Sequence, residues 1–202
     1  MPKIVRKHEK KRSIAIAAID LIAENGLAQT SVESIAMAAN VGKGTVYLYF
    51  KTKEEIIIEI WDYVCSLLNA HRVEKFKTAQ SVYEKIAIFY DFSVLKEKNI
   101  LDKLLKIYAN NISIVLTSTH TALQENFNKK TQEDIEAIKD ILQEGIKKGE
   151  LKNFDVDLIS TIYEKIFKGT IINGICKGSS VDDLRQSLKK QREFLFELIK
   201  KD

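Results

Sequence analysis

Proline is nearly absent from this chain of 202 residues, and its single copy stands at position 2. Only eight glycines are spread over the rest. Proline in a helix interior removes a backbone hydrogen bond and clashes with the preceding turn, and glycine costs about 1 kcal/mol there. A chain with so few of either can stay helical over long stretches. Because 45 % of the residues are hydrophobic, a packed core is also expected. The sequence therefore predicts an all-α protein.

Apolar residues at helical spacing divide the chain into successive predicted helices. The first runs from about Lys7 to Asn25, and Gly26 is free to end it with a positive φ. The second is short and ends near Ala38, and the pattern of a later one allows a break near Asn128. The other predicted helices span residues 43–49, 53 to beyond 70, 81–98, 99–119, 121–148, 155–176 and 181–200.

Two Thr-x-x-Glu patterns predict where helices begin. In such a capping box, the hydroxyl accepts a backbone hydrogen bond from the residue three positions on, and the glutamate returns one. Thr30 with Glu33 would start the second helix, and Thr52 with Glu55 would start the fourth. Between them, Asn40 is the natural turn residue, because Asn tolerates the left-handed conformation better than most side chains.

The second and third predicted helices have the size and spacing of a helix-turn-helix. In the third, Val46 and Phe50 lie one turn apart and are expected to pack inward. Thr45 lies on the flank, where its hydroxyl and methyl could meet a base edge. The opposite side combines a lysine, a bare backbone and a tyrosine hydroxyl, which suits close approach to a phosphate backbone: Lys43, Gly44, Tyr47 and Leu48.

The excess basic charge lies in the same part of the chain. Residues 1–53 hold nine Lys and Arg against four Asp and Glu, whereas the remainder holds 23 against 24. This distribution indicates a polyanionic partner for the N-terminal segment, although a solvated basic tail would give the same counts. The helix N-termini at Thr30-Ser31 and Lys53 would add free N–H groups that favour phosphate.

No pattern indicates catalysis, a metal or a cofactor. The "GKGT" of residues 42–45 follows a helix and has no glycine five residues before Gly42, so it is not a nucleotide-binding loop. The three histidines lack motif partners, and Cys65 and Cys176 are far apart without metal spacing. No signal peptide and no transmembrane helix are expected, which predicts a cytoplasmic protein without a membrane partner.

Residues 34–57, "SIAMAANVGKGTVYLYFKTKEEII", resemble the helix-turn-helix signature of the TetR family of transcriptional regulators. The leading helix that ends in "ENG" and the "TSVESIA" that follows extend the similarity over residues 8–60. Three positions depart from the common family pattern: Asn40 replaces a glycine, Gly42 a serine, and Leu48 a polar residue such as histidine. A DNA contact at Leu48 would therefore be apolar, for instance with a thymine methyl.

The resemblance implies an N-terminal three-helix helix-turn-helix domain over residues 1–52, followed by a helical ligand-binding and dimerisation domain over residues 53–202. It implies a homodimer through the last two helices, about residues 155–200, on a palindromic operator of double-stranded DNA. A small apolar effector would release this repressor, and no cofactor is implied. Carried over by motif, the DNA-binding residues are Thr30, Ser31, Lys43, Gly44, Thr45, Tyr47, Leu48, Tyr49 and Lys53. The wording of "GTVYLYFKTKEEI" and "EGIKKGEL" leans toward the FadR-like members that control fatty-acid metabolism, and so toward an acyl-CoA.

For the effector site, the sequence offers aromatic and polar residues on the middle helices. Aromatic residues on helices belong more often to the core than to a ligand site, and the apolar helix over residues 155–176 could be either a dimer interface or central in its own domain. A helical small-molecule-binding module without sequence-specific DNA binding is the alternative function, but it leaves the basic segment and the exposed third helix unexplained. The candidate effector residues are Trp61, Phe89, Tyr90, Tyr108, Asn111 and Phe127.

Overall fold

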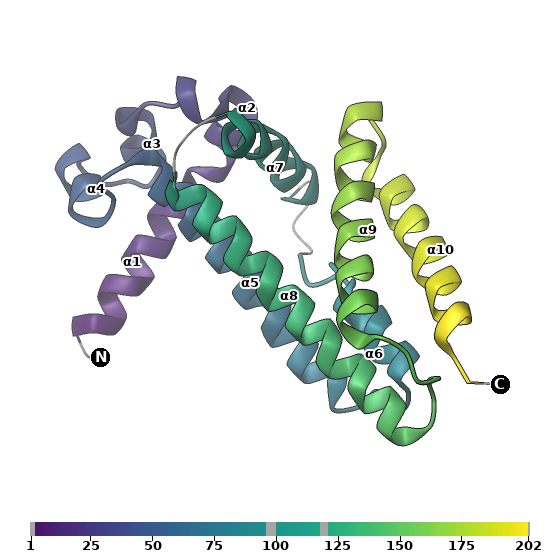
Figure 1. Cartoon of the computed structure of the whole chain (residues 1–202). Coiled ribbons are helices and arrows are strands. Elements are labelled where there is room, and N and C mark those ends of the chain that lie inside the picture. The colour runs from purple at the N-terminus through teal and green to yellow at the C-terminus, as the bar shows by residue number, and fades with distance from the viewer. Residues whose placement is uncertain (1–2, 96–99, 118–120, 202) are drawn as a thin grey trace. The chain divides into compact units, whose positions relative to one another are not determined.

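The structure, a computed structural model, describes the backbone of residues 3–95, 100–117 and 121–201 (Figure 1). These residues form helices and turns without a strand, apart from one isolated antiparallel bridge between Leu151 and Lys200. The predicted all-α class is confirmed. The helices are α1 (Lys3–Ala17), α2 (Ile19–Gln29), α3 (Val32–Ala38), α4 (Lys43–Tyr49), α5 (Lys53–Phe76), α6 (Val82–Phe89), α7 (Ile100–Thr117), α8 (Thr121–Lys148), α9 (Val156–Lys177) and α10 (Val181–Ile199).

The chain divides into two compact units. The first comprises Met1–Leu67 and Leu95–Asn126, and the second comprises Leu68–Val94 and Phe127–Asp202. The continuous helices α5 and α8 contribute residues to both units. Within the described residues, no helix combines the length and the apolar composition that crossing a bilayer requires.

The first unit holds the predicted helix-turn-helix. Here α2 packs on α7, α1 on α2 and α3, and α3 on α4. Two ion pairs brace this packing, Lys11–Glu59 at 2.9 Å and Lys103–Asp20 at 2.7 Å. Its core is formed by fully buried aliphatic and aromatic side chains, among them Ile14, Ile22, Ile35, Val46, Phe50, Ile57, Ile60 and Ile107.

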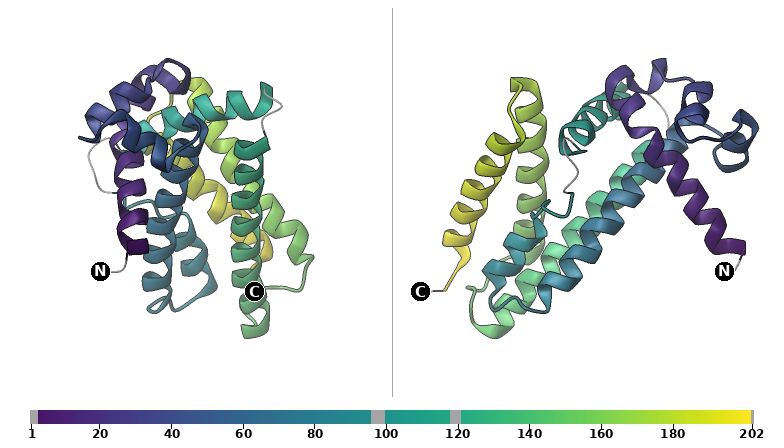
Figure 2. Two further views of the ribbon diagram at one scale, coloured as in Figure 1. Left: turned by 90° about the vertical axis from the view of Figure 1, so that its left-hand side faces the viewer. Right: turned by 180° about the vertical axis from the view of Figure 1, so that it is seen from behind.

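The second unit includes α9 and α10, which pack on each other and lie side by side in the right-hand view of Figure 2. Asp155 caps the start of α9, and Gly178, with φ 65°, ends it. Ser180 and Asp183 form a capping box for α10, which begins at Val181 as predicted. The core combines residues of α6, α8, α9 and α10, among them Val82, Ile86, Phe89, Ile138, Leu142, Tyr163 and Ile199.

The first predicted helix is in fact two helices. α1 ends at Ala17, and α2 begins after Ala18, whose N–H bonds to the Ala15 carbonyl in a tighter turn. Gly26 has φ 73°, which confirms the predicted positive φ. The backbone angles of Gly26 are not helical, so α2 is kinked where the sequence predicts the helix to end, and a further helical turn then runs to Gln29.

Two later boundaries also differ from the prediction. α6 ends at Phe89 and does not continue through residues 90–95, and residues 96–98 of the predicted helix lie outside the described residues. It stops because the Asp91 carboxylate accepts hydrogen bonds from the Ser93 N–H and hydroxyl, a local turn that competes with the helix. α8 runs through Asn128 without a break, since no proline or glycine interrupts it there. It ends at Lys148, as predicted, and Gly149 follows it with φ 74°.

Candidate nucleic-acid interface and effector site

The turn between α3 and α4 sets the direction of α4. Asn40 has φ 50°, as the sequence predicts, and the Val41 N–H donates to the Ala36 carbonyl at 2.9 Å. Gly42 is the N-cap of α4 and gives no side-chain hydrogen bond. The bounds of α4 are those predicted from the sequence, and Figure 1 shows α3 and α4 as neighbouring short helices.

α4 has one buried and one exposed side. Val46 and Phe50 are 1 % and 2 % exposed, so the predicted inward anchors are confirmed. On the other side, Tyr47 is 53 % and Leu48 78 % exposed. Lys43 and Gly44 are exposed beside them, whereas Thr45 and Tyr49 are half-buried on the flanks.

Lys43 forms an ion pair with Glu33 of α3. This hydrogen bond lowers the pKa of the Glu33 carboxyl and raises the pKa of the Lys43 ammonium. Exposed pairs of this kind are worth little, because water screens them and two long side chains must be ordered. The Lys43 ammonium can therefore exchange Glu33 for a phosphate oxygen at small cost.

The start of α3 differs from the prediction. Ser31, not Thr30, is the N-cap: its hydroxyl accepts a hydrogen bond from the Ser34 N–H at 3.0 Å. Thr30 is 2 % exposed, and its hydroxyl donates to the Gly26 carbonyl at 2.7 Å. The Thr30 side chain is held inside by this bond and by a second one to the Leu21 carbonyl at 3.3 Å. Of the two residues, only Ser31 is exposed.

Lys53, the first residue of α5, turns its ammonium inward. It donates to three carbonyls at the end of α2, those of Leu27 at 2.8 Å, Ala28 at 3.0 Å and Thr30 at 3.1 Å. Its three N–H bonds are thus all used within the first unit. The side chain holds the start of α5 against the entrance to α3 and does not point freely outward.

The second predicted capping box is only half formed. Thr52 accepts a hydrogen bond from the Glu55 N–H at 3.4 Å. The Glu55 carboxylate, however, accepts from the Lys51 N–H at 2.7 Å rather than from Thr52. The turn before α5 is therefore closed one residue earlier than the sequence pattern predicts.

The predicted effector residues fall into two groups, one in each unit. In the first unit, the rings of Trp61 and Tyr108 meet edge to face with centroids 6.0 Å apart. Asn111, one turn along α7 from Tyr108, is 7 % exposed, and neither its Oδ1 nor its Nδ2 has a hydrogen-bond partner among the described residues. Burying an amide without hydrogen bonds costs free energy of folding. The side chain of Asn111 is therefore the best candidate among these residues for a hydrogen bond to a ligand.

In the second unit, Phe89 and Tyr90 belong to a larger aromatic cluster. The centroid of the Tyr90 ring lies 5.2 Å from the ring centroid of Phe89, 5.3 Å from that of Phe167 and 6.5 Å from that of Tyr163. The hydroxyls of Tyr90 and Tyr163 are buried without hydrogen-bond partners in the described part of the chain. Burial raises the pKa of both phenols, so each stays neutral and able to donate. The Lys168 ammonium lies over the Phe127 ring, 4.0 Å from the ring centroid.

The sequence reasoning missed the two α9 members of this cluster. Tyr163 and Phe167 are four residues apart and so share one face of α9. Their spacing was visible in the sequence, but the whole helix was assigned to a dimer interface or a central position. The structure gives α9 an inward aromatic face in addition to its exposed apolar residues.

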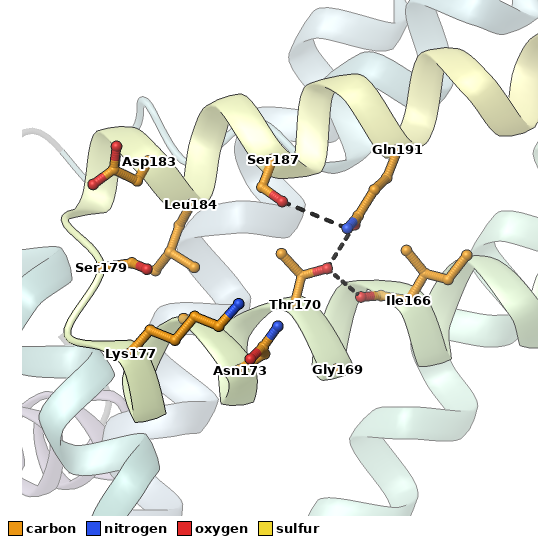
Figure 3. A pocket seen from close by; sticks show the side chains of 11 residues that line it. Ile166, Gly169, Thr170, Asn173, Lys177, Ser179, Asp183, Leu184, Ser187 and Gln191 are labelled. Atoms are coloured by element: carbon orange, nitrogen blue, oxygen red, sulfur yellow. Dashed lines mark hydrogen bonds between the residues drawn. The ribbon is translucent and has the colours of Figure 1, made fainter.

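A cavity of about 340 Å³ opens between α9 and α10 (Figure 3). Its walls carry both polar and apolar groups: the Thr170 hydroxyl donates to Gln191 Oε1 at 2.6 Å, the Gln191 side-chain N–H donates to the Ser187 hydroxyl at 3.5 Å, and Ile166 and Leu184 are apolar. Asn173 and Lys177 complete the α9 wall. This cavity shares no residue with the aromatic cluster or with the predicted effector residues.

Comparison with known proteins identifies the chain. A model of bacterial regulatory proteins of the tetR family matches residues 14–60, the segment that forms α2, α3 and α4 with their flanks. The fatty acid metabolism regulator protein of Bacillus subtilis (strain 168) is 32 % identical over 153 residues, which cover 73 % of each chain. This chain belongs to the TetR family.

Solved structures of TetR-family regulators extend the similarity along the chain. The transcriptional regulator FadR from Bacillus subtilis, determined in complex with stearoyl-CoA, is 28 % identical with a TM-score of 0.67, over 91 % of this chain and 96 % of that one. The fatty acid degradation regulator FadR from Bacillus halodurans is 26 % identical with a TM-score of 0.71 and the same coverage. The predicted leaning toward the regulators of fatty-acid metabolism is thereby confirmed as a similarity.

Membership of the TetR family makes this chain a DNA-binding transcriptional regulator and not an enzyme. The α4 segment, whose exposed side the sequence assigned to DNA, lies inside the part that matches the family model. Within the described residues, no group of three or more His, Cys, Asp or Glu side chains could hold a metal ion.

Proposed function

We propose that this TetR-family regulator represses transcription by binding a palindromic duplex operator as a homodimer, and that an acyl-CoA or a similar small apolar effector releases it. The observation that carries the DNA-binding proposal is the two-sided construction of α4. Val46 and Phe50 fix the helix to the first unit, and Lys43, Tyr47 and Leu48 stay exposed. Residues 1–52 are the proposed DNA-binding part, and residues 53–202 the proposed effector-binding and dimerising part.

The proposed contacts with DNA divide into phosphate and base contacts. Ser31 and Lys43 would bind phosphates, and the bare backbone at Gly44 would allow close approach. Thr45 and Leu48 would face base edges. Tyr47 and Tyr49 complete the proposed set through their hydroxyls. Thr30 and Lys53 are assigned a positioning role instead, because their polar atoms are already bonded within the protein.

We place the proposed dimer interface on α9 and α10. Four large apolar side chains on these helices are exposed, although a folded monomer has no need of them there: Leu158, Ile172, Phe194 and Leu198. Apolar surface of this kind supports a self-complementary two-fold contact. In such a dimer two copies of α4 would enter successive major grooves, with half-site centres about 34–36 Å apart.

The acyl-CoA proposal rests on the relative at 32 % identity and on the FadR structure that holds stearoyl-CoA. Within the first unit we propose Trp61, Tyr108 and Asn111 as ligand contacts. Within the second we propose Phe89, Tyr90 and Phe127. Their aromatic rings suit an apolar chain, and the Asn111 amide, which has no hydrogen-bond partner among the described residues, suits its polar end. Release requires that the ligand bind the DNA-free arrangement more tightly than the DNA-bound one.

The experiment begins with selection of binding sequences from a random duplex library by the purified protein. The selected duplex is then titrated by fluorescence anisotropy at about 150 mM salt. We expect a palindromic consensus and two protomers per duplex. Lys147→Ala, which removes an exposed lysine from the end of α8, is the control for a general loss of positive charge and should bind equally well.

Adding stearoyl-CoA to the complex tests the effector. We expect the anisotropy to fall to that of free DNA, with free coenzyme A as the control for the polar moiety alone. Retention of DNA at saturating stearoyl-CoA would remove the acyl-CoA proposal and leave the DNA-binding proposal in place. If the protein selects no sequence from the library, the proposal of sequence-specific operator binding is refuted.

A further inference from the structure

Leu48 is the most exposed of the large hydrophobic side chains in the described part of the chain, at 78 %. A lone exposed leucine is ordinary on a protein surface. Its position makes it informative, because it lies at the centre of the proposed DNA-facing side of α4. The backbone of Gly44 lies one turn earlier on the same side, and a methyl group placed there would meet nothing within 4 Å. Leu48 thus lies beside backbone that carries no side chain and faces open space, with Lys43 and Tyr47 next to it.

The chemistry of leucine limits what it can read in a major groove. It has neither a hydrogen-bond donor nor an acceptor, so pressing it on the polar edge of guanine, cytosine or adenine would desolvate that edge without return. The thymine C5 methyl is the one apolar group that the base edges present there. A contact between Leu48 and this methyl removes apolar surface of both partners from water.

We propose that Leu48 is a specificity-determining residue that reads the C5 methyl of a thymine in each operator half-site. The inference rests on the proposed function and specifies the base pair that faces α4. Lys43 and Tyr47 would hold the helix on the phosphates, and the bare backbone at Gly44 would let the groove edge come close enough for the methyl contact. A pyrimidine with a C5 methyl is the group recognised, whichever base carries it.

The test uses the selected operator with each thymine replaced in turn by deoxyuridine, which removes the methyl and nothing else. Loss of one buried methyl corresponds to about a fourfold weaker Kd, and symmetric replacement in both half-sites to about 15-fold. Replacing the same T·A pair by C·G should weaken binding, and 5-methylcytosine at that cytosine should recover about fourfold per half-site.

Leu48→Ala provides the pairing between residue and base. At the thymine whose methyl matters to the wild-type protein, this variant should bind the thymine and deoxyuridine operators with Kd values within about twofold of each other. Met37→Ala is the matched control, because Met37 is 76 % exposed but lies on α3. It should keep the full deoxyuridine effect.

The inference is overturned if no single thymine methyl matters to the wild-type protein, or if the effect persists undiminished in Leu48→Ala. Either result would leave sequence-selective DNA binding, and hence the proposed function, intact. A protein that selects no sequence at all would overturn both. Because Leu48 contacts solvent, the variant is expected to keep the wild-type melting temperature, which verifies that any change comes from the DNA contact.

Discussion

Replacing Lys53 by methionine should destabilise the first unit, although lysine at this position of the motif could be expected to bind a phosphate. The ammonium donates to the carbonyls of Leu27, Ala28 and Thr30 at 2.8–3.1 Å. Hydrogen bonds to a charged donor contribute about 1 kcal/mol or more each in net terms, and the freed carbonyls lie in a part-buried turn. We therefore expect a loss of about 2–3 kcal/mol in the free energy of unfolding, which corresponds to about 5–10 °C in Tm for a chain of this size.

Lys51→Met is the matched control for this prediction. Methionine keeps the length and the helix propensity of lysine, and removing a positive charge near a helix N-terminus is slightly favourable at either position. Lys51 is exposed, so its replacement should change Tm by less than about 1 °C. The measurement is thermal unfolding followed by circular dichroism without DNA. Equal melting temperatures of the two variants, together with a selective loss of operator affinity in Lys53→Met, would refute the structural role and favour a phosphate contact.

Three further predictions concern the helical body of the protein. Gly174→Ala should lower the free energy of unfolding by about 1–2 kcal/mol relative to Gly169→Ala, because a methyl at Gly174 would lie 2.1 Å from Leu184 Cδ2 whereas Gly169 has open space; urea unfolding of both variants measures this difference. Asn111→Leu should raise the free energy of unfolding by about 1 kcal/mol, because it removes a buried amide that has no hydrogen-bond partner among the described residues. The same variant should need more stearoyl-CoA for release from the operator, measured by anisotropy. Glu144→Gln should reduce the loss of stability toward acid pH, because hydrogen bonds from Lys148 and Lys85 lower the pKa of the Glu144 carboxyl. The stability that this carboxylate contributes is present above its unfolded pKa of about 4.3 and is lost as pH falls through the lower folded pKa. Melting temperatures of the variant and the wild type that fall in parallel over a pH series would refute this prediction.

Prediction from the sequence succeeded where a residue type favours one backbone conformation, as Asn and Gly do in turns with a positive φ. Asn40 and Gly149 have the positive φ that their turns require, and the ends of α4 match the prediction to the residue. Val46 and Phe50 are buried because a seven-residue helix with one apolar face has a single way to pack. These features depend on neighbours in the chain, and such neighbours are visible in a sequence.

The errors came from interactions between distant residues or from competing caps. Thr30 and Ser31 are both acceptable N-caps, and the choice was made by the Gly26 carbonyl, which takes the Thr30 hydroxyl. Lys53 lies at a position suited to phosphate binding, but three carbonyls more than twenty residues earlier in the chain take up its ammonium. The end of α6 was set by the side chain of Asp91, whose bonds to Ser93 outweigh helix propensity.

The central claim is that the exposed side of α4 binds operator DNA. Its most direct test is the Kd of the selected operator for the double variant Lys43→Ala, Tyr47→Phe, measured by anisotropy at moderate salt beside the wild type and Lys147→Ala. We predict at least a tenfold weaker Kd for the double variant and no change for the control, with the same oligomeric mass for all three proteins. A double variant that binds the operator as tightly as the wild type would contradict the assignment of this surface to DNA.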